Sequence, residues 1–326
     1  MTLRVRLHES ATARSLAFAR ILLGSIWIVS LAVDDIGALA HLPRELFRPY
    51  GLLAVLPEQV WDAALSPGGL VVTTVLVAAA AAWMTVGLPG ARAAAVALVL
   101  GGLFYVELKK GFGGHWDHRE LMLLYTTALL TILPAWDAVA ARRPAPALRP
   151  AATYRAGLVA LSFLVVVHYL FIGVARFAMG APDVFQNGTL QAWIANRNLR
   201  PDPFGFEFGT WFLDPAWALP LDLLFLAGTA LEIAAVAVLF LRPGLLKVGL
   251  ALAFAGFHLA ILGLMNVAFL EDTVLLLLWF DLAAPWRRLV PERRVGLAPP
   301  AAVDRGPVGR WVLGDRRWTT RRPQVD

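Results

Sequence analysis

Ionisable and polar side chains inside apolar stretches of this chain are the first candidates for chemistry. An ionisable group in the hydrocarbon core of a membrane costs roughly 2.5–3.5 kcal/mol, so each one needs a partner or a function. We consider two sets of residues. The candidate reacting set is His118, His168 and Arg176, and the candidate ligand-binding set is Tyr125, Glu232 and His258.

Helical spacing places members of these sets on common faces. His168 and Arg176 are eight residues apart, just over two turns, and His118 and Tyr125 are seven apart. Eight residues rise about 12 Å along a helix, so Arg176 would lie near the mouth of a pocket and His168 near its floor. We therefore expect His118, His168 and Arg176 to converge on one pocket, with Glu207 as the internal partner of Arg176 when the pocket is empty.

Structural roles compete with these functional ones. A His or Glu inside a span commonly forms an interhelical hydrogen bond, and an Arg at the end of a span commonly anchors the helix at the interface. The spacing of His115 and His118 would suit two metal ligands. However, the chain has six histidines, no cysteine and no evident third ligand, so we predict no metal site.

The elements that must position these residues are apolar segments of membrane-spanning length. A helix needs about 20 apolar residues to cross about 30 Å of hydrocarbon. The pattern predicts an all-α, polytopic membrane helix bundle with about eight spans, of which the third and eighth are short. The expected spans are Ser15–Val33, Gly69–Val86, Ala94–Tyr105, Glu120–Trp136, Gly157–Phe177, Ala216–Leu241, Leu245–Leu264 and Val267–Leu282.

Arginine-rich segments alternate with mixed-charge segments between these spans. The arginine-rich ones include Arg4 and Arg6 before the first span, Arg142 and Arg143 between the fourth and fifth, and many arginines after the eighth. Positive charge in short loops favours the cytoplasmic side. The alternation therefore predicts that both termini are cytoplasmic and that the candidate pocket faces the opposite side.

Composition supports a membrane protein and excludes several other classes. Hydrophobic residues make up 59% of the 326 residues and charged residues 16%, which is unusual for a soluble domain. The net charge of +6 follows from arginines at span ends and in the tail, which suit anionic lipids better than nucleic acid. Without cysteine there is no disulfide framework and no thiolate ligand. The expected location is a bacterial plasma membrane, with the bilayer and a lipophilic small molecule as partners.

Two regions are expected. Residues 14–284 would form the membrane domain. Residues 285–326 are rich in Arg, Pro and Gly, and the composition predicts a basic, mostly disordered cytoplasmic tail.

Several short motifs resemble a known family. The stretch from Gly113 to Asp137 is similar to the "N-H-x-Y-L … L-x-P" stretch of the HTTM family, with Asp117-His118 in place of Asn-His. HTTM stands for horizontally transferred transmembrane domain, the membrane part of vitamin K-dependent gamma-carboxylase. Three other segments resemble later family motifs and extend the match over about residues 14–284. They are Arg20–Gly24, His168–Leu190, and Glu232–Leu259 with its Arg242-Pro243-Gly244 and Phe257-His258.

The resemblance implies a quinone or hydroquinone as cofactor. In the carboxylase, a base deprotonates vitamin K hydroquinone, and the oxygenated product removes the gamma proton of a peptidyl glutamate before CO2 adds. His118 matches the family's His, whereas Arg176 stands where the family has its basic Lys. A lysine can act as a base when it is neutral, but an arginine stays protonated. Glutamate carboxylation by the family route is therefore not expected.

Three functions stay open from the sequence. The first is an enzyme related to the carboxylase that acts on a quinone-like or other lipophilic substrate. The second is a binding or accessory membrane protein without catalysis. The third, a transporter, rests only on the charges inside the spans.

Overall fold

The computed structural model describes residues 7–113, 118–138, 149–186, 188–198 and 208–285. The side chains of residues 118 and 119 are outside this description, although both belong to a helix. The chain divides into two units, residues 1–291 and 292–326, and all described residues belong to the first. The expected boundary between residues 284 and 285, and the nature of the tail, stay predictions.

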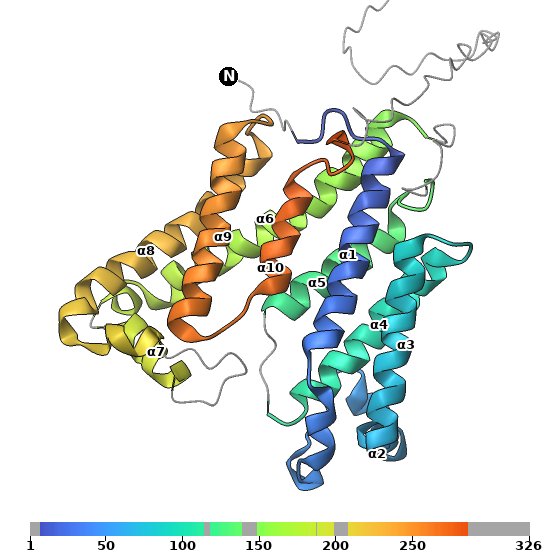
Figure 1. Ribbon diagram of the computed structural model, residues 1–326, viewed down its shortest axis with the longest axis horizontal. Coiled ribbons are helices and arrows are strands. Elements are labelled where there is room, and N and C mark those ends of the chain that lie inside the picture. Colours follow the sequence, from blue (N-terminus) through green and yellow to red (C-terminus); the bar gives the residue numbers. More distant parts are fainter. Residues whose placement is uncertain (1–6, 114–117, 139–148, 187, 199–207, 286–326) are drawn as a thin grey trace, which may run out of the picture. The chain divides into compact units, whose positions relative to one another are not determined.

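The described residues are helical and contain no strand, as predicted (Figure 1). Among the described residues, six helices are long and apolar enough to cross a membrane. They are α1 (Ala13–Val33), α3 (Pro67–Val86), α4 (Ala91–Lys110), α6 (Ala151–Gly180), α8 (Ala218–Ala234, extended by the 3-10 segments η6, Pro215–Trp217, and η7, Ala235–Leu239) and α9 (Leu245–Met265).

The predicted count of eight spans is not confirmed, because two expected spans are short. In the fourth, α5 (His118–Ile132) has 15 residues and ends just before Pro134, which cannot continue a helix. In the eighth, α10 (Leu270–Leu275) has six residues and passes into η8 (Leu276–Trp279). The third is longer than expected, since α4 continues to Lys110, whose ammonium pairs with a carboxylate.

Shorter elements connect the long helices. The α-helices among them are α2 (Glu58–Leu65) and α7 (Thr189–Asn198), and the 3-10 segments are η1 (Ile36–His41), η2 (Arg44–Leu46), η3 (Leu53–Val55), η4 (Asp183–Phe185) and η5 (Phe208–Leu213). Helix α7 packs against α8 and α9. The segment that carries α7 joins the end of α6 to the start of α8.

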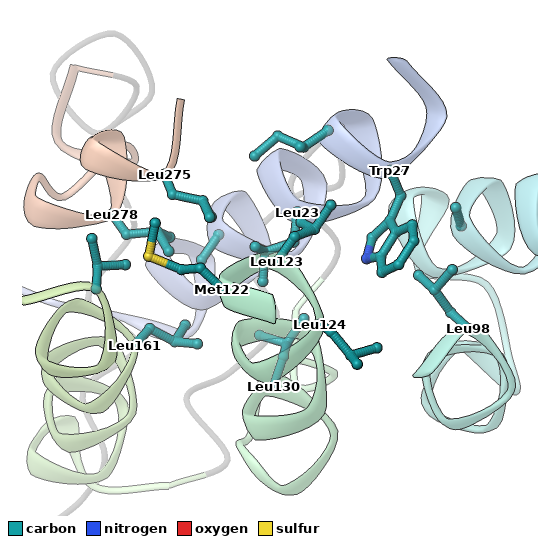
Figure 2. Packing of buried hydrophobic residues seen from close by; sticks show 14 of the residues in the cluster. Leu23, Trp27, Leu98, Met122, Leu123, Leu124, Leu130, Leu161, Leu275 and Leu278 are labelled. Carbon is teal, nitrogen blue, oxygen red and sulfur yellow. The ribbon is translucent and has the colours of Figure 1, made fainter. Parts of the chain in front are cut away.

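Helix α5 lies at the centre of the apolar core (Figure 2). It packs against α1, α4, α6 and α10. Its Met122 and Leu123 are buried together with Leu23 of α1, Leu161 of α6 and Leu275 of α10. A short helix can therefore be fully integrated here, because it is surrounded by protein on several sides.

Arg20 ties α1 to the ends of two neighbouring helices. Its side chain is 1% exposed, and Nη1 donates to the carbonyls of Ala135 at 2.6 Å and Ala138 at 3.2 Å. Gly87, which ends α3 with a φ of 73°, leaves space for the same guanidinium. A Cβ at that position would lie 2.1 Å from Nη2. The buried charge thus faces carbonyl oxygens of the turn that follows α5.

Apolar side chains cover the outer faces of α3 and α9. Val71, Val75 and Leu76 on α3 and Leu252 and Leu259 on α9 are all more than half exposed. A water-soluble protein rarely exposes such continuous apolar surface, whereas hydrocarbon accepts it without cost. These faces suit contact with lipid.

Candidate functional site

A cavity of about 1250 Å³ lies among α5, α6, α7, α8 and α9. Its lining is mainly apolar and includes Phe171 of α6, Leu224 of α8 and Phe257 of α9. Phe171 is 75% exposed, so part of the cavity wall is accessible from outside the protein. The volume exceeds the usual range of about 300–1000 Å³ for small-molecule pockets.

Six of the described lining residues carry polar side-chain atoms, and they come from three helices. His168 and Arg176 come from one face of α6, Tyr125 comes from α5, and Trp193, Asn196 and Arg197 come from α7. The first two share a face because they are eight residues apart on a continuous helix. Asn196 and Arg197 were not among the predicted site residues. In the sequence, only a short polar stretch within the aromatic segment between α6 and α8 pointed to these two residues.

Arg176 forms an ion pair with Glu232 of α8. The carboxylate is buried, whereas the Arg176 side chain is 23% exposed and lines the cavity. The guanidinium also lies over the ring of Phe225, 5.3 Å from its centroid. Gly173, one turn before Arg176, brings the two helices close, because a Cβ there would lie 3.1 Å from the Cβ of Glu232.

Glu232 thus occupies the role that the sequence analysis gave to Glu207, which is outside the described residues. Glu232 itself was expected to bind ligand directly. It is not among the cavity-lining residues and acts on the cavity through Arg176.

His258 belongs to a buried network behind the cavity. Its Nδ1 is 2.8 Å from Thr273 Oγ1, which donates its own hydrogen to the carbonyl of Phe269. Thr273 must then accept from Nδ1–H, so the neutral ring presents Nε2 as an acceptor. Nε2 lies 3.4 Å from the hydroxyl of Tyr169. His258 therefore connects α6, α9 and α10 and does not line the cavity.

His118 is described only by its backbone, which begins α5. Its side chain lies outside the described residues, so the expected convergence of three groups reduces to His168 and Arg176 on the cavity wall. Tyr125, two turns further along α5, lines the same cavity and is 51% exposed.

A second polar cluster lies on the other side of α5. Lys109 Nζ is 2.6 Å from Asp34 Oδ2 and 3.1 Å from Glu120 Oε1, and Lys110 Nζ is 3.0 Å from Glu120 Oε2. A small cavity of about 20 Å³ lies beside this cluster. Glu271 also lines it and accepts a hydrogen bond from Ser30 at 2.8 Å. The ionic role of Asp34 was not predicted from the sequence.

Helix α5 separates this ionic cluster from the large cavity. Glu120 and Leu123 line the small cavity, whereas Leu121 and Tyr125 line the large one. In the part of the chain that the structure describes, no group of three or more potential ligand side chains could hold a metal ion. What the large cavity offers is an apolar surface with cationic and hydrogen-bonding groups at a few points.

Comparison with models of known protein families, with curated protein sequences and with solved structures finds no match.

Proposed function

We propose that this chain is an integral membrane protein of the HTTM type that binds a quinone-like or other lipophilic molecule in the cavity beside α6. The observation that carries the proposal is an apolar cavity of about 1250 Å³ with His168 and Arg176 on its wall. Apolar pockets with a few placed polar groups are the usual form of binding sites for organic ligands. Six helices of spanning length support the membrane assignment.

The proposal includes the predicted topology. The lengths of the apolar segments suggest eight crossings, and with eight crossings the arginine pattern of the loops places the termini in the cytoplasm and the cavity on the opposite side. For the two short segments, α5 and α10, a crossing would need further residues on either side of the helix.

Binding is favoured over carboxylase-type catalysis. Arg176 stands where the resembling family has a lysine base, and a guanidinium stays protonated. Its ion pair with Glu232 stabilises that charge further. The ion pair therefore favours a non-catalytic binding or accessory membrane protein over catalysis at Arg176.

The test is to identify what co-purifies with the protein. An organic extract of the protein in detergent is compared by mass spectrometry with an extract of Ala260→Trp, in which an indole would fill part of the cavity. A quinone or other lipophilic species should be enriched in the wild type and depleted in this variant. Val71→Trp is the matched control, because Val71 is 62% exposed on α3 and outside the cavity. Equal extracts from all three proteins would argue against the proposal.

A further inference from the structure

The charges on the cavity wall have one sign. Among the described residues that line the cavity are two arginines, Arg176 and Arg197, and no Asp or Glu. Two acidic residues of α8 lie outside the cavity lining. They are Glu232, which pairs with Arg176, and Asp222, whose Oδ2 accepts a hydrogen bond from the backbone N–H of Gly188.

Arg197 is the second positive charge on the cavity wall. Within the described ranges it forms no ion pair, and its side chain is exposed at the cavity. Trp193 lies three residues before Asn196 and four before Arg197 on α7, so it neighbours both side chains, and all three line the cavity. This face of α7 therefore presents a guanidinium, an amide and an indole to a single ligand.

The rest of the lining suits an apolar chain. Phe171 and Ile172 of α6, Leu231 of α8 and Ile261 of α9 present hydrocarbon over the length of the cavity. A ligand that matches both the polar face of α7 and this apolar lining has a long apolar body and one negatively charged end. A neutral quinone would fill the apolar part and could accept a hydrogen bond from Arg197, but it would bring no negative charge to pair with the guanidinium.

We infer that the cavity binds an amphiphile with an anionic head group, a carboxylate or a phosphate, which lies against Arg197 and Asn196. The inference rests on the proposed function and specifies the class of its ligand. The apolar chain extends from α7 along α6, α8 and α9. Arg176, held by Glu232, provides a second positive surface on the same wall.

The test compares charged and neutral lipids that carry the same acyl chain, together with a neutral quinone that has no chain. The full chain in a neutral detergent is titrated by calorimetry with oleate, with methyl oleate, with oleoyl lysophosphatidate and with the neutral 2,3-dimethyl-1,4-naphthoquinone. Either anionic lipid should bind at least about tenfold more tightly than methyl oleate, as expected for one charge-assisted contact. Of the two anions, the one that binds more tightly identifies the head group as a carboxylate or a phosphate.

Two variants test the role of Arg197. Arg197→Gln should weaken binding of the anion about tenfold and leave methyl oleate unchanged. Arg242→Gln, at an exposed arginine outside the cavity, should change neither. Because Arg197 is exposed, both variants are expected to fold, and equal melting temperatures would verify this.

The outcomes separate the inference from the proposed function. Equal binding of oleate and methyl oleate, or an anion affinity that Arg197→Gln does not change, would overturn the inference. Binding of the naphthoquinone alone would overturn it as well but would support the proposed function. If none of the four ligands binds and no lipophilic species co-purifies, both fail.

Discussion

Arg176 of α6 and Glu232 of α8 form an ion pair at the boundary between the protein interior and the large cavity. The carboxylate is the buried member and the guanidinium the accessible one. Glu232 thus holds the Arg176 guanidinium in place, and Arg176 presents its positive charge to the cavity. The pair also explains how two ionisable residues are tolerated inside apolar helices.

Glu232→Gln should destabilise the protein, because it leaves the Arg176 guanidinium without a counter-charge. We expect a loss of about 3 kcal/mol, at the lower end for a broken buried pair, since Arg176 is partly exposed. The double variant Arg176→Met/Glu232→Leu should recover most of this loss, because no charge is then buried. Thermal unfolding in detergent measures both. A double variant as unstable as Glu232→Gln would contradict this account.

Gly102→Ala should destabilise the contact between α1 and α4. A Cβ at this position would lie 2.5 Å from the ring of Trp27, which is 3% exposed. The ring cannot easily move, because its Nε1 donates to Thr127 Oγ1 at 2.9 Å. We expect a loss of about 1–3 kcal/mol. Gly249→Ala on α9 is the control, since its Cβ would meet nothing within 4 Å. A small gain of roughly 0.5–1 kcal/mol is expected there, and equal melting of the two variants would refute the prediction.

Stability should fall with pH below about 6.5 because of His8. Burial, helped by the nearby Lys247 and opposed by Asp281, lowers the pKa of His8 to about 3. The folded protein therefore keeps this ring neutral, and its Nε2 lies 2.7 Å from Ser162 Oγ. The unfolded chain binds a proton near pH 6.5, so the stabilisation is complete above that pH and is lost as the pH falls toward 3.

The expected slope from His8 is about 1.4 kcal/mol per pH unit in this interval. Melting temperatures of the wild type and His8→Gln between pH 7.5 and pH 5 would show it as a steeper decline in the wild type. His41→Gln serves as the control, because His41 is exposed on η1. Parallel profiles for the wild type and His8→Gln would exclude the assignment.

Lys109→Met should be more destabilising than a typical loss of a surface charge. Lys109 contacts both Asp34 and Glu120, and Glu120 is 8% exposed. Its removal leaves two carboxylates near each other, of which Glu120 keeps its contact with Lys110, so we expect a loss of about 3–5 kcal/mol. Arg92→Met removes an exposed hydrogen bond to Thr131 and should cost far less. Comparable melting temperatures for these two variants would rule out a stabilising role for the cluster.

Introduced cysteines can test the predicted topology, because the chain has none. Gly113→Cys should react with a membrane-impermeant thiol reagent in intact cells. Ala301→Cys, in the arginine-rich tail, should react only after permeabilisation, since positive segments favour the cytoplasm. The opposite labelling pattern would show that the orientation is the reverse of the predicted one.

The sequence by itself determined the all-helical class and most of the long helices. Each of these depends on local properties, namely a run of apolar residues and the breaks at its ends, as in Pro67–Val86 between Ser66 and Gly87. It also determined that His168 and Arg176 share a face, because that follows from helical spacing alone.

Only the tertiary structure decided which residues meet across helices. The pairing of Arg176 with Glu232 joins positions 56 residues apart, and that of Lys109 with Asp34 joins positions 75 apart. Hydropathy also could not show that α5 is a short helix in the centre of the core, because a buried helix and a spanning helix have the same apolar composition. Packing between segments that are distant in the chain is what turns His258 away from the cavity and brings Arg197 to it.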